Sequence, residues 1–535
     1  MKTIKSPESN YDFVIIGSGF GGSVSALRLS EKGYKVLVVE KGRQFSPDDF
    51  PLTNWNLKKW LWLPSVRFFG FFKMTFFKHV GVLSGVGVGG GSLVYANTLP
   101  RPPKSFFNSG NWAGLADWEK ELDSFYEIAE TMLGASRNPK LYDSDLTLKE
   151  LAEKIGKGNM FEPTRASVFF GEPEKIVSDP YFNGEGPDRE GCSYCGGCMT
   201  GCKHNAKNSL DKNYLYLAEI RGAQILPGHI VKKIVPLDKK DGKTGYKIVI
   251  KRTAAIFNPH KQIITSKGIV VSGGVLGTVR LLLDMKKKCL TGLSDRTGDC
   301  IRTNNESLVL VDSRKYDKDF SKGIAIGSIF PPDENSHIEA VRYGGGSGFW
   351  KLLAMPQVHG RNFITRSGKL LLHLIRHPAS WFHIYVTRDF ARQSVILLYM
   401  QHLNSTLKLK RGIFNLKSSM SEGIPPSAFM PESKELSERV ASIIDGKPFV
   451  LITEAVTGIP TTAHILGGSV IGSTGEEGVI DVNHKVFGYQ NFYVCDGSAI
   501  SSNPGVNPSL TITAMTERAM SKIPEKYLNE SFINY

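Results

Sequence analysis

The sequence predicts an α/β protein of two domains, one with a Rossmann-like parallel sheet and one with a mixed sheet. Three observations lead to this prediction. The chain has 535 residues, of which 41% are hydrophobic, and a chain of this length buries two or more cores. Residues 11–42 place a helical stretch between two apolar runs, as parallel strands and their crossover helix do. Residues 301–454 contain short alternating segments, which are typical of a sheet with one solvated face.

The stretch 11–42 has every part of a dinucleotide-binding βαβ unit in the required order. The turn after its first apolar run has G-x-G-x-x-G spacing at Gly17, Gly19 and Gly22. The first glycine allows a tight turn, the second lets a pyrophosphate approach the backbone, and the third lets helix and strand pack closely. The helix N-terminus offers N–H groups to the phosphates. Glu40 closes the second run and is expected to accept hydrogen bonds from a ribose diol. We therefore predict a Rossmann-like dinucleotide-binding domain.

Charge and composition limit which partners and which cellular location we expect for this protein. The net charge of +15 suits nucleic acid, an anionic membrane surface or solubility alone. Because Lys and Arg are scattered and no nucleic-acid motif is present, we expect no nucleic-acid partner. We find neither a signal peptide nor an apolar run long enough to span a bilayer. The seven cysteines do not resemble a secreted disulfide framework. We expect a cytoplasmic protein, with peripheral membrane contact as an open alternative.

Two apolar segments each allow two interpretations. Residues 55–80 hold three tryptophans and six phenylalanines interleaved with Lys and Arg. They form either a loop on the protein's own core or a lid that touches a membrane. Residues 369–390 are apolar with basic residues distributed along them. They form either a core helix or a second membrane-facing element.

A second glycine segment, G-V-G-V-G-G-G-S, occupies residues 85–92. So many glycines leave little side chain between the backbone and what it covers. In a dinucleotide enzyme this pattern indicates contact with a flat ring system or with the pyrophosphate. Towards the C-terminus, His464 stands among small and apolar residues, and Asn507 precedes a helical stretch.

The G-S-G-F-G-G start, the second glycine segment and the pairing of His464 with Asn507 together resemble the glucose–methanol–choline (GMC) oxidoreductases. Within that family the chain is similar to the cholesterol-oxidase-type branch, from about Tyr11 to Met520. The resemblance implies FAD as cofactor. The positions that match the family's FAD contacts are Gly17, Gly19, Phe20, Gly21, Gly22, Glu40, Gly85, Gly87, Gly90, Gly91, Ser92, Asn97, Val231, Gly273, Asp496, Gly497 and Asn507.

The resemblance also implies an activity within steroid or lipid metabolism. A bulky apolar alcohol, such as the sterol cholesterol, would lose a hydride to the flavin and become a ketone. Its electrons would pass to oxygen or to a carrier. His464 would accept the hydroxyl proton and Asn507 would hold the hydroxyl oxygen. Glu339, in an apolar and basic neighbourhood, is either a solvated carboxylate or a further acid/base that isomerises the product.

Four cysteines follow the C-x2-C-x2-C-x3-C spacing of a ferredoxin cluster: Cys192, Cys195, Cys198 and Cys202. Thiolates at these intervals can surround an iron–sulfur cluster. The proline that usually follows the fourth cysteine is Lys203 here. A zinc site, local disulfides and reduced structural thiols are the alternatives.

We expect FAD-binding segments at 1–105, 191–300 and 455–535, substrate or cap segments at 106–190, and a substrate domain at 301–454. Three functions stay open from the sequence. The first is an FAD-dependent oxidase of a bulky alcohol. The second is a dehydrogenase of the same fold that passes electrons through an iron–sulfur cluster to a carrier. The third is a non-catalytic flavoprotein docked at a membrane.

Overall fold

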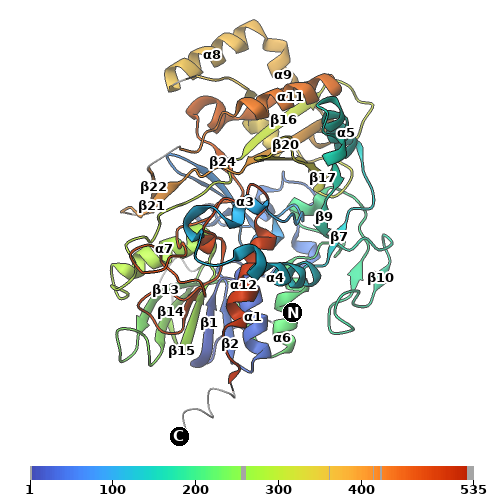
Figure 1. Cartoon of the computed structure of the whole chain (residues 1–535). Coiled ribbons are helices and arrows are strands. Elements are labelled where there is room, and N and C mark those ends of the chain that lie inside the picture. Colours follow the sequence, from blue (N-terminus) through green and yellow to red (C-terminus); the bar gives the residue numbers. More distant parts are fainter. Residues whose placement is uncertain (1–2, 255–260, 361, 414, 422–424, 527–535) are drawn as a thin grey trace.

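The computed structural model describes residues 3–254, 261–360, 362–413, 415–421 and 425–526. Figure 1 shows two sheets at different heights, with the first sheet at the end nearer the C-terminus and the second at the opposite end. The α/β fold with a Rossmann-like domain is the one that the sequence predicts.

The first sheet is the parallel sheet predicted from residues 11–42. Its strands run in the order β12 (Gln224–Leu226), β2 (Val36–Val39), β1 (Asn10–Ile16), β15 (Lys261–Val271), β14 (Tyr246–Arg252) and β13 (His229–Pro236), and β25 (Phe492–Val494) also pairs with β15. β1 lies between β2 and β15 and is parallel to both. α1 is the helical crossover that connects β1 to its parallel neighbour β2. β14 and β13 extend the sheet as an antiparallel meander.

Helices cover this sheet. One group, seen beside β1 and β2 in Figure 1, comprises α1 (Phe20–Glu31), α6 (Tyr214–Ile220), α12 (Ser509–Ser521) and α4 (Trp118–Met132). α1 is buried along ten of its positions, since it packs against both the sheet and α12. α7 (Gly274–Lys286) follows β15 directly and packs against β13.

The second sheet runs in the order β19 (Ala354–Pro356), β23 (Gly446–Leu451), β16 (Ser307–Ser313), β20 (Ser394–Gln401), β18 (Ser336–Val341), β17 (Ile326–Phe330) and β8 (Glu162–Pro163). We expected a mixed sheet with one solvated face. Every described pairing is antiparallel, and both faces are buried. One face packs on α5 (Asp143–Lys154) and α11 (Pro431–Ile443), and the other faces the first domain. The alternation in the sequence therefore does not separate a core face from a solvated face, because the strands are buried on both.

Part of the aromatic segment 55–80 packs against the second sheet. β5 (Phe72–Phe76) and β6 (Gly81–Gly85) form a hairpin that β24 (Thr461–Thr462) extends. Trp60, Phe71 and Phe72 are buried in the cluster that lies against the second sheet, which confirms the core interpretation for these three. Others on the segment are exposed: Trp55, Leu63, Val66 and Phe76.

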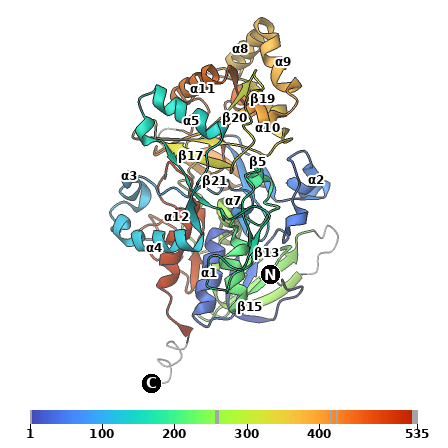
Figure 2. The ribbon, with the colours of Figure 1, turned by 90° about the vertical axis from the view of Figure 1, so that its right-hand side faces the viewer.

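The apolar segment 369–390 forms two helices, α8 (Phe363–Arg376) and α9 (Pro378–Val386). They project at the end of the molecule farthest from the first sheet (Figure 2). Most of α8 is exposed, so it is not a core helix. Among the described helices, none is long and apolar enough to cross a bilayer.

Candidate active site

A cavity of about 310 Å³ lies between the two domains. Glycines of both glycine segments line one end, among them Gly19, Gly85 and Gly91. Side chains of the second sheet line the other end, and these are apolar: Leu308, Leu310, Ile326, Val341, Ile396 and Leu398. Phe72 and Trp350 close this apolar end. The cavity can therefore hold a cofactor against the glycines and an apolar molecule under the sheet.

The first glycine turn packs as its spacing predicts. Gly17 has φ of +103°, and a Cβ there would lie 2.2 Å from the carbonyl oxygen of Ser272. A Cβ on Gly22 would lie 2.1 Å from the carbonyl oxygen of Gly17. Gly19 differs, because a Cβ there meets no protein atom within 4 Å. Gly17 and Gly22 serve the close packing of turn, helix and strand, whereas Gly19 borders the cavity with Phe20 and Gly21.

The second glycine segment lies directly against the first. A Cβ on Gly90 would lie 2.6 Å from Cα of Gly19. Gly87 turns the chain at φ of +142°, and Gly85 has no room for a Cβ beside the carbonyl of Gly90. Ser92 is buried and binds the backbone, donating to the Gly89 carbonyl and accepting from the Leu210 N–H.

Asn97 and Asp496 present buried polar groups near the cavity. Asn97 has φ of +71° and is fully buried, and neither polar atom of its side chain has a hydrogen-bond partner among the described residues. Its neighbours Ala96 and Thr98 line the cavity. Asp496 and Gly497 line it directly. Burial raises the pKa of Asp496, while hydrogen bonds from Ser498 and Thr278 act in the opposite direction.

The remaining predicted cofactor contacts are Glu40, Val231 and Gly273, and like Gly17, Gly22, Gly87, Gly90, Ser92 and Asn97 they lie outside the lining of this cavity. The Glu40 carboxylate accepts hydrogen bonds from the backbone N–H and hydroxyl of Ser18 and from the Gly42 N–H. It therefore holds the glycine turn in place at the end of β2. Val231 lies within β13, and Gly273 precedes α7, between Ser272 and Gly274 of the cavity wall.

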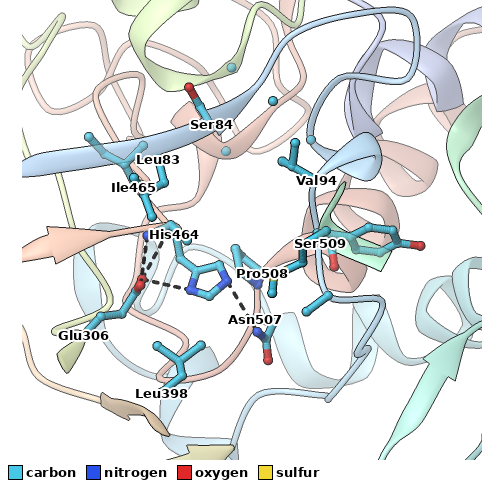
Figure 3. Close-up of a pocket in the computed structure, with 18 of the residues that line it drawn as sticks. Leu83, Ser84, Val94, Glu306, Leu398, His464, Ile465, Asn507, Pro508 and Ser509 are labelled. Carbon is cyan, nitrogen blue, oxygen red and sulfur yellow. Dashed lines mark hydrogen bonds and ion pairs between the residues drawn. The ribbon is translucent and has the colours of Figure 1, made fainter. Parts of the chain in front are cut away.

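His464 and Asn507 meet at the junction of the two ends of the cavity. His464 follows β24, and Asn507 stands just before α12. The Asn507 Nδ2 lies 3.4 Å from the His464 Nε2. On the other side of the ring, Nδ1 lies 2.8 Å from the Glu306 carboxylate. Figure 3 shows the imidazole ring between the Glu306 carboxylate and the Asn507 amide.

Glu306 fixes the orientation of this histidine. It precedes β16 and is buried, and its carboxylate also accepts from the Thr462 hydroxyl at 2.8 Å and from the backbone N–H groups of Ala463 and His464. Because Nδ1–H donates to the carboxylate, the neutral ring has its lone pair on Nε2. Nε2 is therefore the atom that can accept a proton from a molecule in the cavity.

The same contacts set the acidity of His464. Burial by itself would lower the pKa of this histidine, but the charge of Glu306, its hydrogen bond and the more distant charge of Glu339 raise the pKa above its ordinary value. Sequence reasoning did not identify Glu306. A lone glutamate before a strand carries no motif, and only the fold brings it to His464.

Glu339 is not solvated. Its side chain is fully buried in β18 and lies 2.9 Å from Nε2 of His337. The interpretation of Glu339 as a solvated carboxylate was therefore wrong. The second carboxylate oxygen lies 3.4 Å from the Asn507 Nδ2. Glu339 therefore stands behind Asn507 rather than in the lining of the cavity. The Asn507 amide oxygen is buried and has no partner within the described part of the chain.

The four clustered cysteines give no support to a metal site. They line a cavity of about 20 Å³ together with His204 and Lys207. Within the ranges that the structure describes, no group of three or more His, Cys, Asp or Glu side chains could hold a metal ion. Burial raises the pKa of Cys192 and brings that of Cys198 to about 11, so without a bound metal both are protonated thiols.

These cysteines are also free of disulfides, as are the other three in the chain. The iron–sulfur prediction thus has no support, and of its alternatives the structure agrees with reduced thiols. The dehydrogenase that would use such a cluster loses the observation that suggested it.

A dinucleotide-type glycine turn that opens on an apolar cavity, with a buried histidine–amide pair between them, is the arrangement of a flavin- or nicotinamide-dependent oxidoreductase. Residues 185–284 and 428–516 match the family described as GMC oxidoreductase, and residues 15–48 match the NAD(P)-binding Rossmann-like domain. The chain belongs to the GMC oxidoreductases, which are FAD-dependent enzymes acting on the CH–OH group of donors.

Relatives of known activity cover nearly the whole chain. It is 45% identical to a cholesterol oxidase of Acinetobacter baumannii, over 97% of this chain and 96% of that protein. It is 43% identical to a cholesterol oxidase of Mycobacterium tuberculosis, over 97% and 92%. A pyridoxine 4-oxidase from Mesorbium loti shares the fold at a TM-score of 0.60 and 15% identity, over 96% of this chain and 98% of that one.

The residues present fit FAD. The open space at the Cβ position of Gly19 gives a phosphate direct access to the backbone, and the N-terminus of α1 lies beside it. Gly85 and Gly91 of the second glycine segment present backbone without side chains to the cavity, and a ring system can lie against it. Asn97 supplies two buried polar atoms that have no partner in the described ranges, whereas buried polar groups normally have one.

Proposed function

We propose that this enzyme oxidises the secondary hydroxyl of a sterol such as cholesterol to the ketone, with oxygen as the electron acceptor. The single observation in the structure that supports the substrate class is the cavity itself: its far end is lined mainly by apolar side chains of the second sheet, and the hydrogen-bonded pair of His464 and Asn507 lies where that end meets the glycine segments. A rigid apolar alcohol with one hydroxyl matches this distribution. The relatives named cholesterol oxidases favour the same class.

The residues divide the work at the hydroxyl. Bound FAD would accept the hydride from the carbinol carbon. His464 Nε2 accepts the hydroxyl proton, since its lone pair faces the cavity. Asn507 Nδ2 donates to the same oxygen and holds it without bringing a charge. The 3.4 Å separation of the two nitrogens is long for a hydrogen bond, so one hydroxyl oxygen can engage both.

Glu306 acts on the reaction through His464. Its carboxylate keeps the proton on Nδ1 and stabilises the imidazolium that forms when Nε2 takes up a proton. We therefore assign Glu306 as a positioning residue. The Glu306 carboxylate also raises the pKa of His464 and thereby sets the pH range in which His464 can accept a proton.

Replacing Glu306 with glutamine is expected to move the pH profile of flavin reduction to lower pH. Reduction needs neutral His464, so its rate rises with pH through the pKa of that group, which Glu306 holds above the ordinary value. Glutamine keeps the size of the side chain but removes its charge, so the pKa falls. Stopped-flow reduction across pH 5 to 9, about two units either side of neutrality, measures the shift. An unchanged midpoint, with only a uniform loss of rate, would assign Glu306 a purely structural role.

Substrate class is tested by comparing cholesterol, a long linear alcohol and a short secondary alcohol. We expect kcat/KM for cholesterol to exceed that for the short alcohol by about 10²-fold or more, because each buried methylene contributes about 0.8 kcal/mol. Oxygen uptake and peroxide formation follow turnover. If the linear alcohol is preferred, or the short one is turned over equally well, the sterol assignment fails while FAD-dependent alcohol oxidation stands.

A further inference from the structure

α8 and α9 present an apolar surface to solvent. Ile364, Leu371 and Ile375 recur along α8 at spacings of seven and four, which puts them on one face of a helix. Their side chains are 77%, 60% and 67% exposed. Phe382 and Val386 are exposed on α9. Soluble proteins rarely expose contiguous apolar surfaces without a partner.

The two helices are anchored from beneath. On α9, Ile384 is fully buried, and the Tyr385 hydroxyl donates to the Ala354 carbonyl at 2.6 Å. On α8, the Arg366 guanidinium donates to the carbonyls of Gly360, Val456 and Thr457. The outward apolar face is thus held in place by the second domain and does not result from a detached helix.

The charge of this surface has one sign. Residues 362–388 contain Arg366, Lys369, Arg376 and Arg388, together with three histidines, and no Asp or Glu. Lys369, Arg376 and Arg388 are exposed. Helices that lie in the interface of an anionic membrane have an apolar face with basic side chains beside it, as this surface does.

The surface continues beyond the two helices. The Lys351 ammonium donates to the Thr387 carbonyl beyond the end of α9 and lies 6.0 Å from the centre of the Trp55 ring. Trp55 and Leu352 are exposed. Trp and Lys side chains of this kind suit the headgroup region of a bilayer.

From these observations we propose that α8 and α9 dock this enzyme on the surface of a bilayer that contains anionic phospholipid, with Ile364, Leu371 and Ile375 in the acyl boundary. A second copy of the chain fits this surface less well than an anionic bilayer does. A twofold contact would bring identical basic surfaces together, and like charges across an interface oppose association. Anionic headgroups complement the basic side chains instead.

The test uses the full-length, flavin-loaded protein and vesicles of phosphatidylcholine with or without phosphatidylglycerol. We expect co-sedimentation with the mixed vesicles, weakened by salt and weaker with phosphatidylcholine alone. The double variant Ile364→Asp, Ile375→Asp is expected to lower the partition coefficient by about tenfold or more, since it puts charges in the acyl boundary. Lys369→Glu with Arg376→Glu is expected to lower binding to the anionic vesicles only.

A matched control is Ile176→Asp with Ile413→Asp, two side chains that are 69% and 80% exposed and lie away from α8 and α9. It should bind vesicles as the unmodified protein does. Flavin content and thermal unfolding check that each variant is folded. The proposal is overturned if the unmodified protein ignores anionic vesicles, or if the α8 variant binds as well as the control. It is also overturned if light scattering shows a dimer that the α8 variant dissociates.

Discussion

Replacing His464 with alanine is expected to slow reduction of the flavin by a sterol about 10²-fold or more. The variant loses the only lone pair that Glu306 orients towards the hydroxyl, so the proton must leave to water as the hydride departs. FAD should remain bound, because His464 borders the junction of the cavity rather than the glycine turns.

Anaerobic stopped-flow measurement of flavin absorbance gives the rate directly. The matched control is His383→Ala, because His383 also pairs a ring nitrogen with a buried carboxylate, that of Asp312 at 2.9 Å, but does not line the cavity. Its reduction rate should stay within about twofold, since it touches no reacting atom. If His464→Ala reduces as fast as the control, the proton goes elsewhere and the role assigned to His464 is wrong.

Short sequence motifs were enough to predict the glycine turn at the nucleotide-binding end of the cavity. Spacing alone placed Gly17, Gly19 and Gly22 in one turn, because each has a separate steric task that no other residue can perform. The structure refines this by showing which glycines face protein and which faces the cavity. His464 and Asn507 are 43 positions apart in the sequence. Only the resemblance to a family linked them.

The sequence could not predict contacts that depend on long-range packing. Glu306 reaches His464 across 158 positions and has no motif of its own. The burial of Glu339 was missed because its local neighbourhood does not reveal that both faces of its sheet are covered. The cysteine spacing constrains only a short loop and does not by itself predict a metal site. The iron–sulfur prediction has no support, because no group of three or more His, Cys, Asp or Glu in the described part of the chain could hold a metal ion.

Gly19 is the position where a side chain should remove FAD without damaging the protein. A Cβ at Gly19 meets no atom of the described residues within 4 Å, so a β-carbon at this position does not strain the turn. What a valine would displace is the ligand whose phosphate approaches this backbone. We therefore expect Gly19→Val to fold but to purify with less than about one tenth of a flavin per chain.

Two further glycine variants separate ligand loss from misfolding. Gly368→Val, in α8, also has open space at Cβ and should retain FAD, since it lies far from both glycine segments. Gly22→Val would press its Cβ to within 2.1 Å of the Gly17 carbonyl oxygen and should be destabilised or insoluble. Absorbance at the flavin band, together with circular dichroism, distinguishes the three outcomes. A folded Gly19→Val protein with stoichiometric flavin would show that the pyrophosphate does not lie at this turn, and the cofactor would have to be placed elsewhere in the cavity.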